Sequence, residues 1–415
     1  MIKIDKNLFK ILIFTLVPIT SLLLGFKFNE DLSAGGSVYD FNLTWPVVIK
    51  YSNLEFTGTN EFTRHMPFHY GLLAILNYIF NEQNFVRLIY LFFSLSLPFL
   101  LYLNLSQIYK NNKLNLIIIS FSFLFIPLLR SSAIWANAHY TALIFFLIGN
   151  FFYLKSKEKK TYIYKLFNLL FLSFSIYAVQ TYLIIFLFYL YNYFLSEKFN
   201  NFIKIFFFCI FLSLPGLYFI YLNPRINNIT ITFDIFYTLL TNFSIIFFFF
   251  LFLIFNKESL EIIINKIKNL NKIELIIMLF LLIFIFYHQD SIIFYGGLKG
   301  GGFFYKISFF LLGNKLIFLL SAYLGIITAY VLIKYEPKLI YAIIINNLMA
   351  LNYIVHQKYF EPLFLIIIAV LYKNFLISNV VLKFKNILVF YLLVLIYFSI
   401  AYINFAYEFS IKLLL

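Results

Sequence analysis

Three acidic residues follow the first long apolar run of the chain. Glu30 and Asp31 come directly after that run, and Asp40 stands nine residues beyond Asp31, after the pair Gly35-Gly36. A carboxylate that is partly desolvated at a membrane surface can act as a general base or bind a cation. The alternative is a solvated loop with ordinary surface acids. Asp31 and Asp40 are the stronger candidates for chemistry, because they lie beside a glycine turn where an apolar helix ends.

Two histidines form the next candidate group. His65 and His69 stand on either side of Pro67, and imidazole nitrogens can bind a phosphate or a hydroxyl of a ligand. Their spacing of four residues also suits a metal pair, but no third ligand is evident nearby. We therefore expect no metal at these histidines, and a divalent ion elsewhere in the chain is left open.

A glycine-rich segment, residues 288–308, could bind an anion. It contains five of the fourteen glycines, together with Lys299 and Lys306. Backbone amides exposed by glycines, next to lysines, can cradle a phosphate. The alternative is a flexible loop that gates a site. No Gly-Lys-Ser/Thr sequence follows, so we do not expect a nucleoside triphosphate.

The remaining polar candidates lie at the ends of apolar runs. They are Arg130, His139, Gln180, Arg225, His356, Lys358 and Tyr359. Such side chains are costly at a membrane unless they face a cavity, a partner or water. A hydrogen-bonded packing role is the simpler explanation for a residue such as His139.

The composition indicates that lipid surrounds the elements that hold these residues. The chain is 63% hydrophobic and only 12% charged, whereas a soluble domain has about 25% charged residues. The net charge of +15 is spread over short loops between apolar runs and forms no continuous stripe, so we expect no nucleic-acid partner. The single cysteine, Cys209, excludes a disulfide within the chain.

Thirteen apolar runs approach the roughly 20 residues that a membrane-spanning helix needs. They are residues 8–26, 85–108, 114–129, 133–154, 162–179, 181–196, 202–222, 233–255, 273–288, 312–333, 339–355, 362–378 and 387–407. We therefore predict an all-α polytopic membrane protein with about 13 transmembrane helices, forming a single transmembrane domain over residues 1–415. A shorter apolar stretch, from Pro67 to Phe80, predicts a helix along the outer surface, with Pro67 in the favoured first turn.

The basic residues indicate the orientation. With the N-terminus in the cytoplasm, most lysines fall on the cytoplasmic side, as the positive-inside rule requires. All arginines and all five histidines then fall on the outer side. We expect the first outer loop, about residues 27–84, and the glycine-rich outer loop, about 288–308, to form the active site.

This layout resembles the GT-C superfamily of integral-membrane glycosyltransferases, which take sugars from polyprenyl-phosphate carriers. The first of three short features that carry the resemblance is the acids after the first span. The second is His65-Met66-Pro67 ahead of an apolar surface helix. The third is Lys358-Tyr359-Phe360-Glu361-Pro362, which is similar to the Arg-Tyr-x-x-Pro found late in several members. The acid pair reads Glu-Asp here, where Asp-Glu or Asp-Asp is commoner.

The resemblance implies a multi-pass glycosyltransferase of a bacterial inner membrane that acts in cell-envelope polysaccharide biosynthesis. Its donor would be a polyprenyl-phosphate-linked sugar, its acceptor a hydroxyl of a glycan, lipid or protein, and no cofactor is firmly implied. Asp31 would be the general base, with Asp40 second and Glu30 beside them. His65 and His69 would shape the sugar site, and the donor phosphate would be bound by Arg225, Lys306, His356, Lys358 and Tyr359.

Two other functions fit a many-span protein. An O-antigen-type polymerase or ligase usually has its long outer loop late in the chain, whereas the longest loop here comes first. A lipid-linked-oligosaccharide flippase or other transporter should place ionisable residues near the bilayer midplane, whereas here they cluster at the outer ends of spans.

Overall fold

The computed structural model describes residues 6–33, 36–55, 65–110, 113–222, 235–287, 301–350, 360–361, 363–374, 377–378 and 382–414. Every regular element within these ranges is helical, and no strand occurs in them. The all-α fold class is therefore confirmed. The chain divides into two compact units, residues 1–229 with 394–415 and residues 230–393, which are described separately below.

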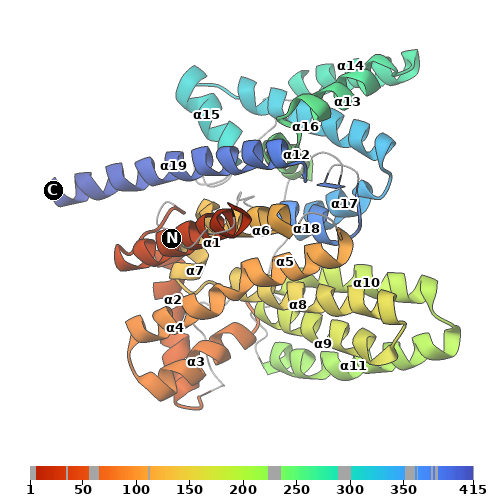
Figure 1. The fold of residues 1–415 in the computed structure, drawn as a ribbon. Helices are drawn as coiled ribbons and strands as arrows, with labels where there is room; N and C mark the ends of the chain where they lie inside the picture. The colour runs from red at the N-terminus through yellow and green to blue at the C-terminus, as the bar shows by residue number, and fades with distance from the viewer. Residues whose placement is uncertain are drawn as a thin grey trace. The chain divides into compact units, whose positions relative to one another are not determined.

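The first unit is a bundle of helices of unequal length (Figure 1). Its helices are α1 (Lys6–Lys27), α2 (Gly36–Ser52), α3 (Phe68–Phe80), α4 (Gln83–Ser94), α5 (Ser96–Ile108), α6 (Lys113–Ser122), α7 (Pro127–Ile134), α8 (Ala138–Lys159), α9 (Tyr162–Ala178), α10 (Leu183–Ser196) and α11 (Phe199–Leu222). The C-terminal part of α19 (Phe384–Leu414) also belongs to this unit. Helices α8 to α11, yellow to green in Figure 1, lie side by side, and α2 packs on α3.

Buried asparagines join four helices of the first unit. The Nδ2 of Asn150 on α8 donates to Asn104 Oδ1 on α5 at 2.8 Å, and Asn168 Nδ2 on α9 donates to the carbonyl of Gly149 at 2.9 Å. Tyr189 on α10 donates to Asn150. Without competing water, such interhelical hydrogen bonds satisfy polar groups that would otherwise be stranded among apolar side chains.

The second unit contains most helices of the chain's later half. They are α12 (Ile235–Ile254), α13 (Lys257–Lys268), α14 (Lys272–Tyr287), α15 (Gly302–Leu312), α16 (Leu316–Tyr335), α17 (Leu339–Met349) and α18 (Leu363–Val370). Helices α12 and α16 pack closely, because Gly325 leaves room for the backbone of Phe243: an added Cβ would lie 2.1 Å from the Phe243 carbonyl oxygen. A small residue at such a contact is typical of helices packed in a membrane.

Six described helices are long and apolar enough to cross a membrane. They cover Phe9–Lys27, Gln83–Ile108, Phe199–Leu222, Phe236–Ile254, Leu316–Tyr335 and Phe384–Ala406. Two helix pairs bent by 69° and 105° would raise the number to eight. These helices fit a polytopic membrane protein, whereas the count of thirteen spans and the orientation stay predictions.

The segment predicted as the first outer loop, residues 27–84, is more helical than the sequence indicates. Helix α3, Phe68–Phe80, has nearly the extent of the helix predicted from Pro67 to Phe80, and Pro67 is its N-cap rather than its first residue. That this helix lies along the outer surface stays a prediction. Helix α2 was not predicted. Its apolar residues are interrupted by polar ones and by Pro46, so the pattern is typical of a loop. The single transmembrane domain over residues 1–415 stays a prediction.

Candidate functional site

Glu30 and Arg130 form a buried ion pair in the first unit. Arg130 Nε donates to Glu30 Oε1 at 2.8 Å and Nη2 donates to Oε2 at 2.9 Å, and both side chains are at most 2% exposed. Arg130 also donates to the carbonyl and hydroxyl of Ser21 and to the carbonyl of Leu124. Gly25 makes room for the pair, since an added Cβ would lie 2.7 Å from Glu30 Oε2 and 2.8 Å from Arg130 Nη2.

Asp31 caps the beginning of helix α2. Its Oδ2 accepts a hydrogen bond from the backbone amide of Val38 at 2.9 Å, and its Oδ1 accepts from the amide and hydroxyl of Ser33. A carboxylate at a helix N-terminus satisfies otherwise unpaired amides and interacts favourably with the helix dipole. Asp31 is only 4% exposed, so its hydrogen-bonding capacity is largely used within the fold.

Asp40 has a different environment from the other two acids. It lies in α2, one turn beyond the helix start, and is half-buried. Burial, followed by the nearby charges of Asp40 and Tyr51, raises the pKa of the Tyr70 hydroxyl. Asp40 therefore lies close to Tyr70 of helix α3.

His69 is held inside the unit by both ring nitrogens. Its Nε2 donates to the carbonyl of Ala136 at 2.8 Å, and its Nδ1 lies 2.8 Å from the Thr141 hydroxyl, which in turn contacts the Tyr90 hydroxyl. Burial lowers the pKa of His69 to about 3, with a smaller contribution from the charge of His65. Neither nitrogen is left for a substrate, so this geometry suits a positioning role better than ligand binding.

His65 meets two polar residues from distant parts of the chain. Its Nδ1 donates to Gln180 Oε1 at 3.2 Å, and its ring lies edge-on to the ring of His139 with centroids 5.2 Å apart. The three residues come from the segment before α3, the start of α8 and the turn after α9. We refer to His65, His139 and Gln180 as the imidazole cluster. The structure brings these sequence-predicted polar residues together.

An apolar groove of about 570 Å³ runs along α3, beginning at the residues next to His65. Met66, Pro67 and Phe68 line one part, and Tyr51, Ser52 and Leu54 at the end of α2 line another. The lining is completed by Gly71, Leu72, Ala74, Ile75 and Tyr78 of α3, Tyr177 of α9, and Pro215, Gly216 and Phe219 of α11. Such an apolar surface can accommodate a hydrocarbon chain.

Tyr177 enters the backbone of α11 at the groove wall. Its hydroxyl donates to the carbonyl of Leu212 and accepts from the amide of Gly216 at 3.3 Å, so it bridges two groups that would otherwise bond to each other. A side chain inserted in this way opens the helical hydrogen-bond ladder, as does the neighbouring Pro215. An added Cβ on Gly216 would lie 2.7 Å from the Tyr177 ring.

Two residues that sequence reasoning missed support the acidic end of the site. The Trp135 indole donates to the Glu30 carbonyl at 2.9 Å, and the Arg87 guanidinium stacks 3.6 Å from the Trp135 ring centroid. Arg87 also donates to Asn29 Oδ1 at 3.1 Å. The sequence offers one sign of this contact: Arg87 stands at the start of an apolar run, and Trp135 stands in a later turn.

The other predicted site residues lie in the second unit or outside the described residues. Lys306 is an exposed residue of α15 in the second unit. Arg225, His356, Lys358 and Tyr359 lie outside the described residues. Within the described ranges, no group of three His, Cys, Asp or Glu residues could hold a metal ion.

Comparisons of the chain with protein-family models, with curated proteins and with solved structures found no match. Function is therefore inferred from the residues of the site and their geometry.

Proposed function

We propose that the protein is a membrane glycosyltransferase that moves a sugar from a polyprenyl-phosphate carrier to an acceptor hydroxyl at the outer face. The observation that carries this proposal is the apolar groove of about 570 Å³, which begins at Met66 and Pro67 beside the imidazole cluster. A lipid-linked sugar needs this combination, since its hydrocarbon chain requires an apolar surface and its phosphate requires hydrogen-bond donors.

The polar roles follow from where these side chains lie relative to the groove along α3. His65 and His139 bind the phosphate or sugar, and Arg225, Lys306, His356, Lys358 and Tyr359 stay in the proposal as further phosphate ligands. Asp40 replaces Asp31 as the preferred base. Asp40 is preferred because it is half-buried and lies close to Tyr70 of α3, the helix that the groove follows, whereas Glu30 pairs with Arg130 and Asp31 caps α2.

In the proposed reaction, the Asp40 carboxylate removes the proton of an acceptor hydroxyl. The hydroxyl oxygen attacks the anomeric carbon of the sugar and forms the new glycosidic bond. The bond from that carbon to the phosphate oxygen breaks, and the lipid phosphate leaves with the electron pair. The acceptor is a glycan, lipid or protein, and the setting is a bacterial inner membrane crossed by about 13 spans with the N-terminus in the cytoplasm.

Transfer of labelled sugar from a polyprenyl-phosphate donor into acceptor material tests this proposal with variants of the full chain in membranes. Asp40→Asn should lower the transfer rate by about 10² to 10⁴, the usual contribution of a general base. The matched control is Glu82→Gln, since Glu82 is an exposed acid of the same unit whose side chain makes no cap hydrogen bond to α4. It should transfer at the parental rate.

Asp31→Asn separates capping from catalysis. Because Asp31 holds the start of α2, its replacement should lower the temperature of thermal unfolding, with transfer lost only to the extent that folded protein is lost. Parental transfer by Asp40→Asn would contradict the assignment of Asp40, and absence of transfer by the parent protein would contradict the function.

A further inference from the structure

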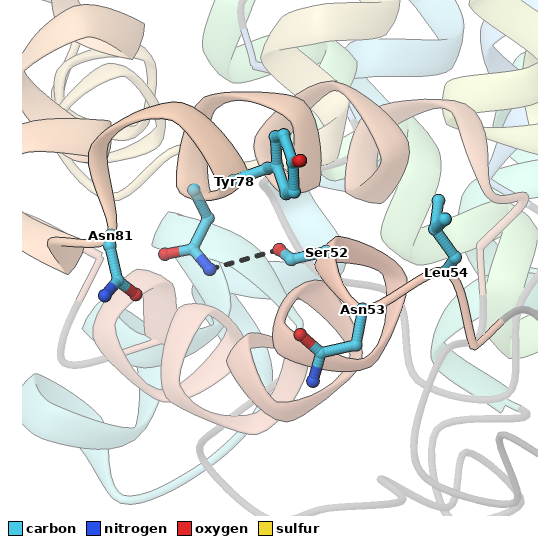
Figure 2. Close-up of a pocket in the computed structure, with 6 residues that line it drawn as sticks. Ser52, Asn53, Leu54, Tyr78 and Asn81 are labelled. Atoms are coloured by element: carbon cyan, nitrogen blue, oxygen red, sulfur yellow. Dashed lines mark hydrogen bonds between the residues drawn. The ribbon is translucent and has the colours of Figure 1, made fainter.

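A second pocket, of about 370 Å³, lies where helices α2 and α3 end. Ser52, Asn53 and Leu54 line it from the end of α2, and Asn77, Tyr78 and Asn81 line it from the end of α3. Figure 2 shows these residues around the pocket, with the hydrogen bond from Asn77 to Ser52 as a dashed line. We call it the amide pocket, and we propose that it binds an uncharged saccharide.

The chemistry of the lining selects the ligand. Three carboxamides and two hydroxyls stand in this small pocket, and none of the described residues that line it is charged. A carboxamide presents a donor and an acceptor side by side, which matches neighbouring hydroxyls of a sugar. A phosphate or a carboxylate would meet no cation among the described residues that line the pocket, so an uncharged ligand rich in hydroxyls fits best.

The two ends of the pocket are fixed by the backbone. Leu54 and Asn81 have φ values of 64° and 48°, in the left-handed region that residues other than glycine rarely adopt. Ser52 donates to the carbonyls of Val48 and Ala74 and accepts from Asn77 at 3.1 Å, so it ties α2 to α3 and orients the Asn77 amide. Polar groups held in place in this way lose little freedom when a ligand binds.

The amides of Asn53 and Asn81 are the groups most accessible to a ligand. Both residues are exposed, and their side chains make no hydrogen bond to any part of the chain that the structure describes. Tyr78, which is 78% exposed, places an aromatic ring at the same rim. An exposed aromatic beside amides offers a flat apolar face to a sugar ring together with hydrogen bonds at its edge.

The amide pocket continues into the apolar groove. Ser52, Leu54 and Tyr78 line both, so a saccharide in the pocket and a hydrocarbon chain in the groove would contact the same three residues. The imidazole cluster lies next to the residues that precede α3, whereas the amide pocket lies at the end of α3. If the proposed function holds, the pocket would grip acceptor sugars remote from the hydroxyl that reacts.

Equilibrium binding to the full chain in lipid nanodiscs tests the inference without requiring transfer. The probes are octyl glycosides of uncharged hexoses, 6-deoxyhexoses and N-acetylhexosamines, with octyl phosphocholine as a probe that has the same chain and a charged head group. We expect at least one glycoside to bind more tightly than octyl phosphocholine. The double variant Asn53→Ala/Asn81→Gly should bind that glycoside about tenfold more weakly, the effect of losing one or two hydrogen bonds.

The variants are chosen so that the fold is retained. Asn53 is exposed, and glycine accepts the left-handed backbone of Asn81. Asn201→Ala, at an exposed position of α11 in the same unit, is the matched control and should bind like the parent. All three proteins should unfold at similar temperatures.

Two results would overturn the saccharide site: no glycoside binding tighter than octyl phosphocholine, or unchanged glycoside affinity in the double variant. Its failure can be told from failure of the transferase. Glycoside binding that needs Asn53 and Asn81, in a parent protein that transfers no sugar, would support the saccharide site and contradict the transferase. Transfer that needs Asp40, with unchanged glycoside affinity in the double variant, would do the reverse.

Discussion

The Glu30–Arg130 ion pair is almost completely removed from water, which determines what either residue can contribute. Taking two charges out of water is expensive, and removing one partner of such a pair typically costs about 3–5 kcal/mol, because the other charge is left buried. Loss of activity in a Glu30 variant would therefore report first on folding. Asp40, which is half-buried, is a cleaner position at which to test chemistry.

His69 should make the stability of the protein depend on pH. Burial lowers its pKa in the folded chain to about 3, from an ordinary value of 6.5. As the pH falls below 6.5, His69 binds a proton in the unfolded chain but not in the folded chain. Its contribution to the free energy of unfolding is therefore complete above pH 6.5 and decreases as the pH falls towards 3. The slope contributed by one such group is about 1.4 kcal/mol per pH unit.

Thermal unfolding of the parent and of His69→Gln between pH 7.5 and 5 measures this contribution. Glutamine can donate to the Ala136 carbonyl but does not titrate, so the unfolding temperature of the variant should fall less steeply with acid. Equal slopes for the two proteins would show that His69 does not carry the dependence.

The imidazole cluster shows what the sequence could and could not predict about the site. The sequence places His65, His139 and Gln180 at ends of apolar runs, which indicates one common side. Which of them meet depends on how α3, α8 and α9 pack, and apolar periodicity carries no information about neighbours. The capping role of Asp31 was missed for a related reason, since the helix that it caps was not predicted.

At the scale of elements, long apolar runs predicted most helices, because lipid exposure requires continuous apolar residues. Helix α1, Lys6–Lys27, follows the predicted run 8–26, and α11, Phe199–Leu222, follows 202–222. Helices of mixed polarity escaped prediction. Helix α13, for example, has lysine and glutamate at its start, three consecutive isoleucines in its middle and two lysines at its end, so it is too short and too polar to be recognised as an apolar run.

Because Tyr177 packs against α11 at Gly216, we predict that position 216 does not tolerate a methyl group. Gly216→Ala would place a Cβ 2.7 Å from the Tyr177 ring, forcing Tyr177 out of its bridge between Leu212 and Gly216. We expect a loss of about 1–3 kcal/mol in stability, as for other overpacked sites. The change is measured by thermal or denaturant unfolding in nanodiscs.

Gly71→Ala is the matched control for this substitution. Gly71 also lies in a helix and lines the same groove, but beyond its chain neighbours and the backbone of its own helix no atom of the described residues lies within 4 Å of its added Cβ. Replacing a helical glycine by alanine there should stabilise the protein by about 0.5–1 kcal/mol. Equal effects of the two substitutions would contradict the proposed contact.

For the molecule as a whole, the lysine distribution predicts sidedness that labelling can test. In a Cys209→Ala background, Asn53→Cys should react with a membrane-impermeant maleimide added to intact spheroplasts, because its loop is predicted to be outside. Lys159→Cys, at the end of α8, should react only after the membrane is opened.

Both positions are exposed and belong to the same unit, so their reactivity differs only through the membrane. Reaction of Lys159→Cys alone in intact spheroplasts would invert the topology and place the amide pocket and the imidazole cluster in the cytoplasm. Reaction of both would show that the segment between them crosses the bilayer an even number of times.

The crowding around Gly25 links three distant positions of the chain. Any side chain at position 25 would collide with both Glu30 and Arg130. The residue types that evolution can accept at one of these three positions therefore depend on the residues at the other two. Homologous sequences that carry a larger residue at 25 should have lost the carboxylate and the guanidinium together, and this coupled change would be visible as covariation in an alignment.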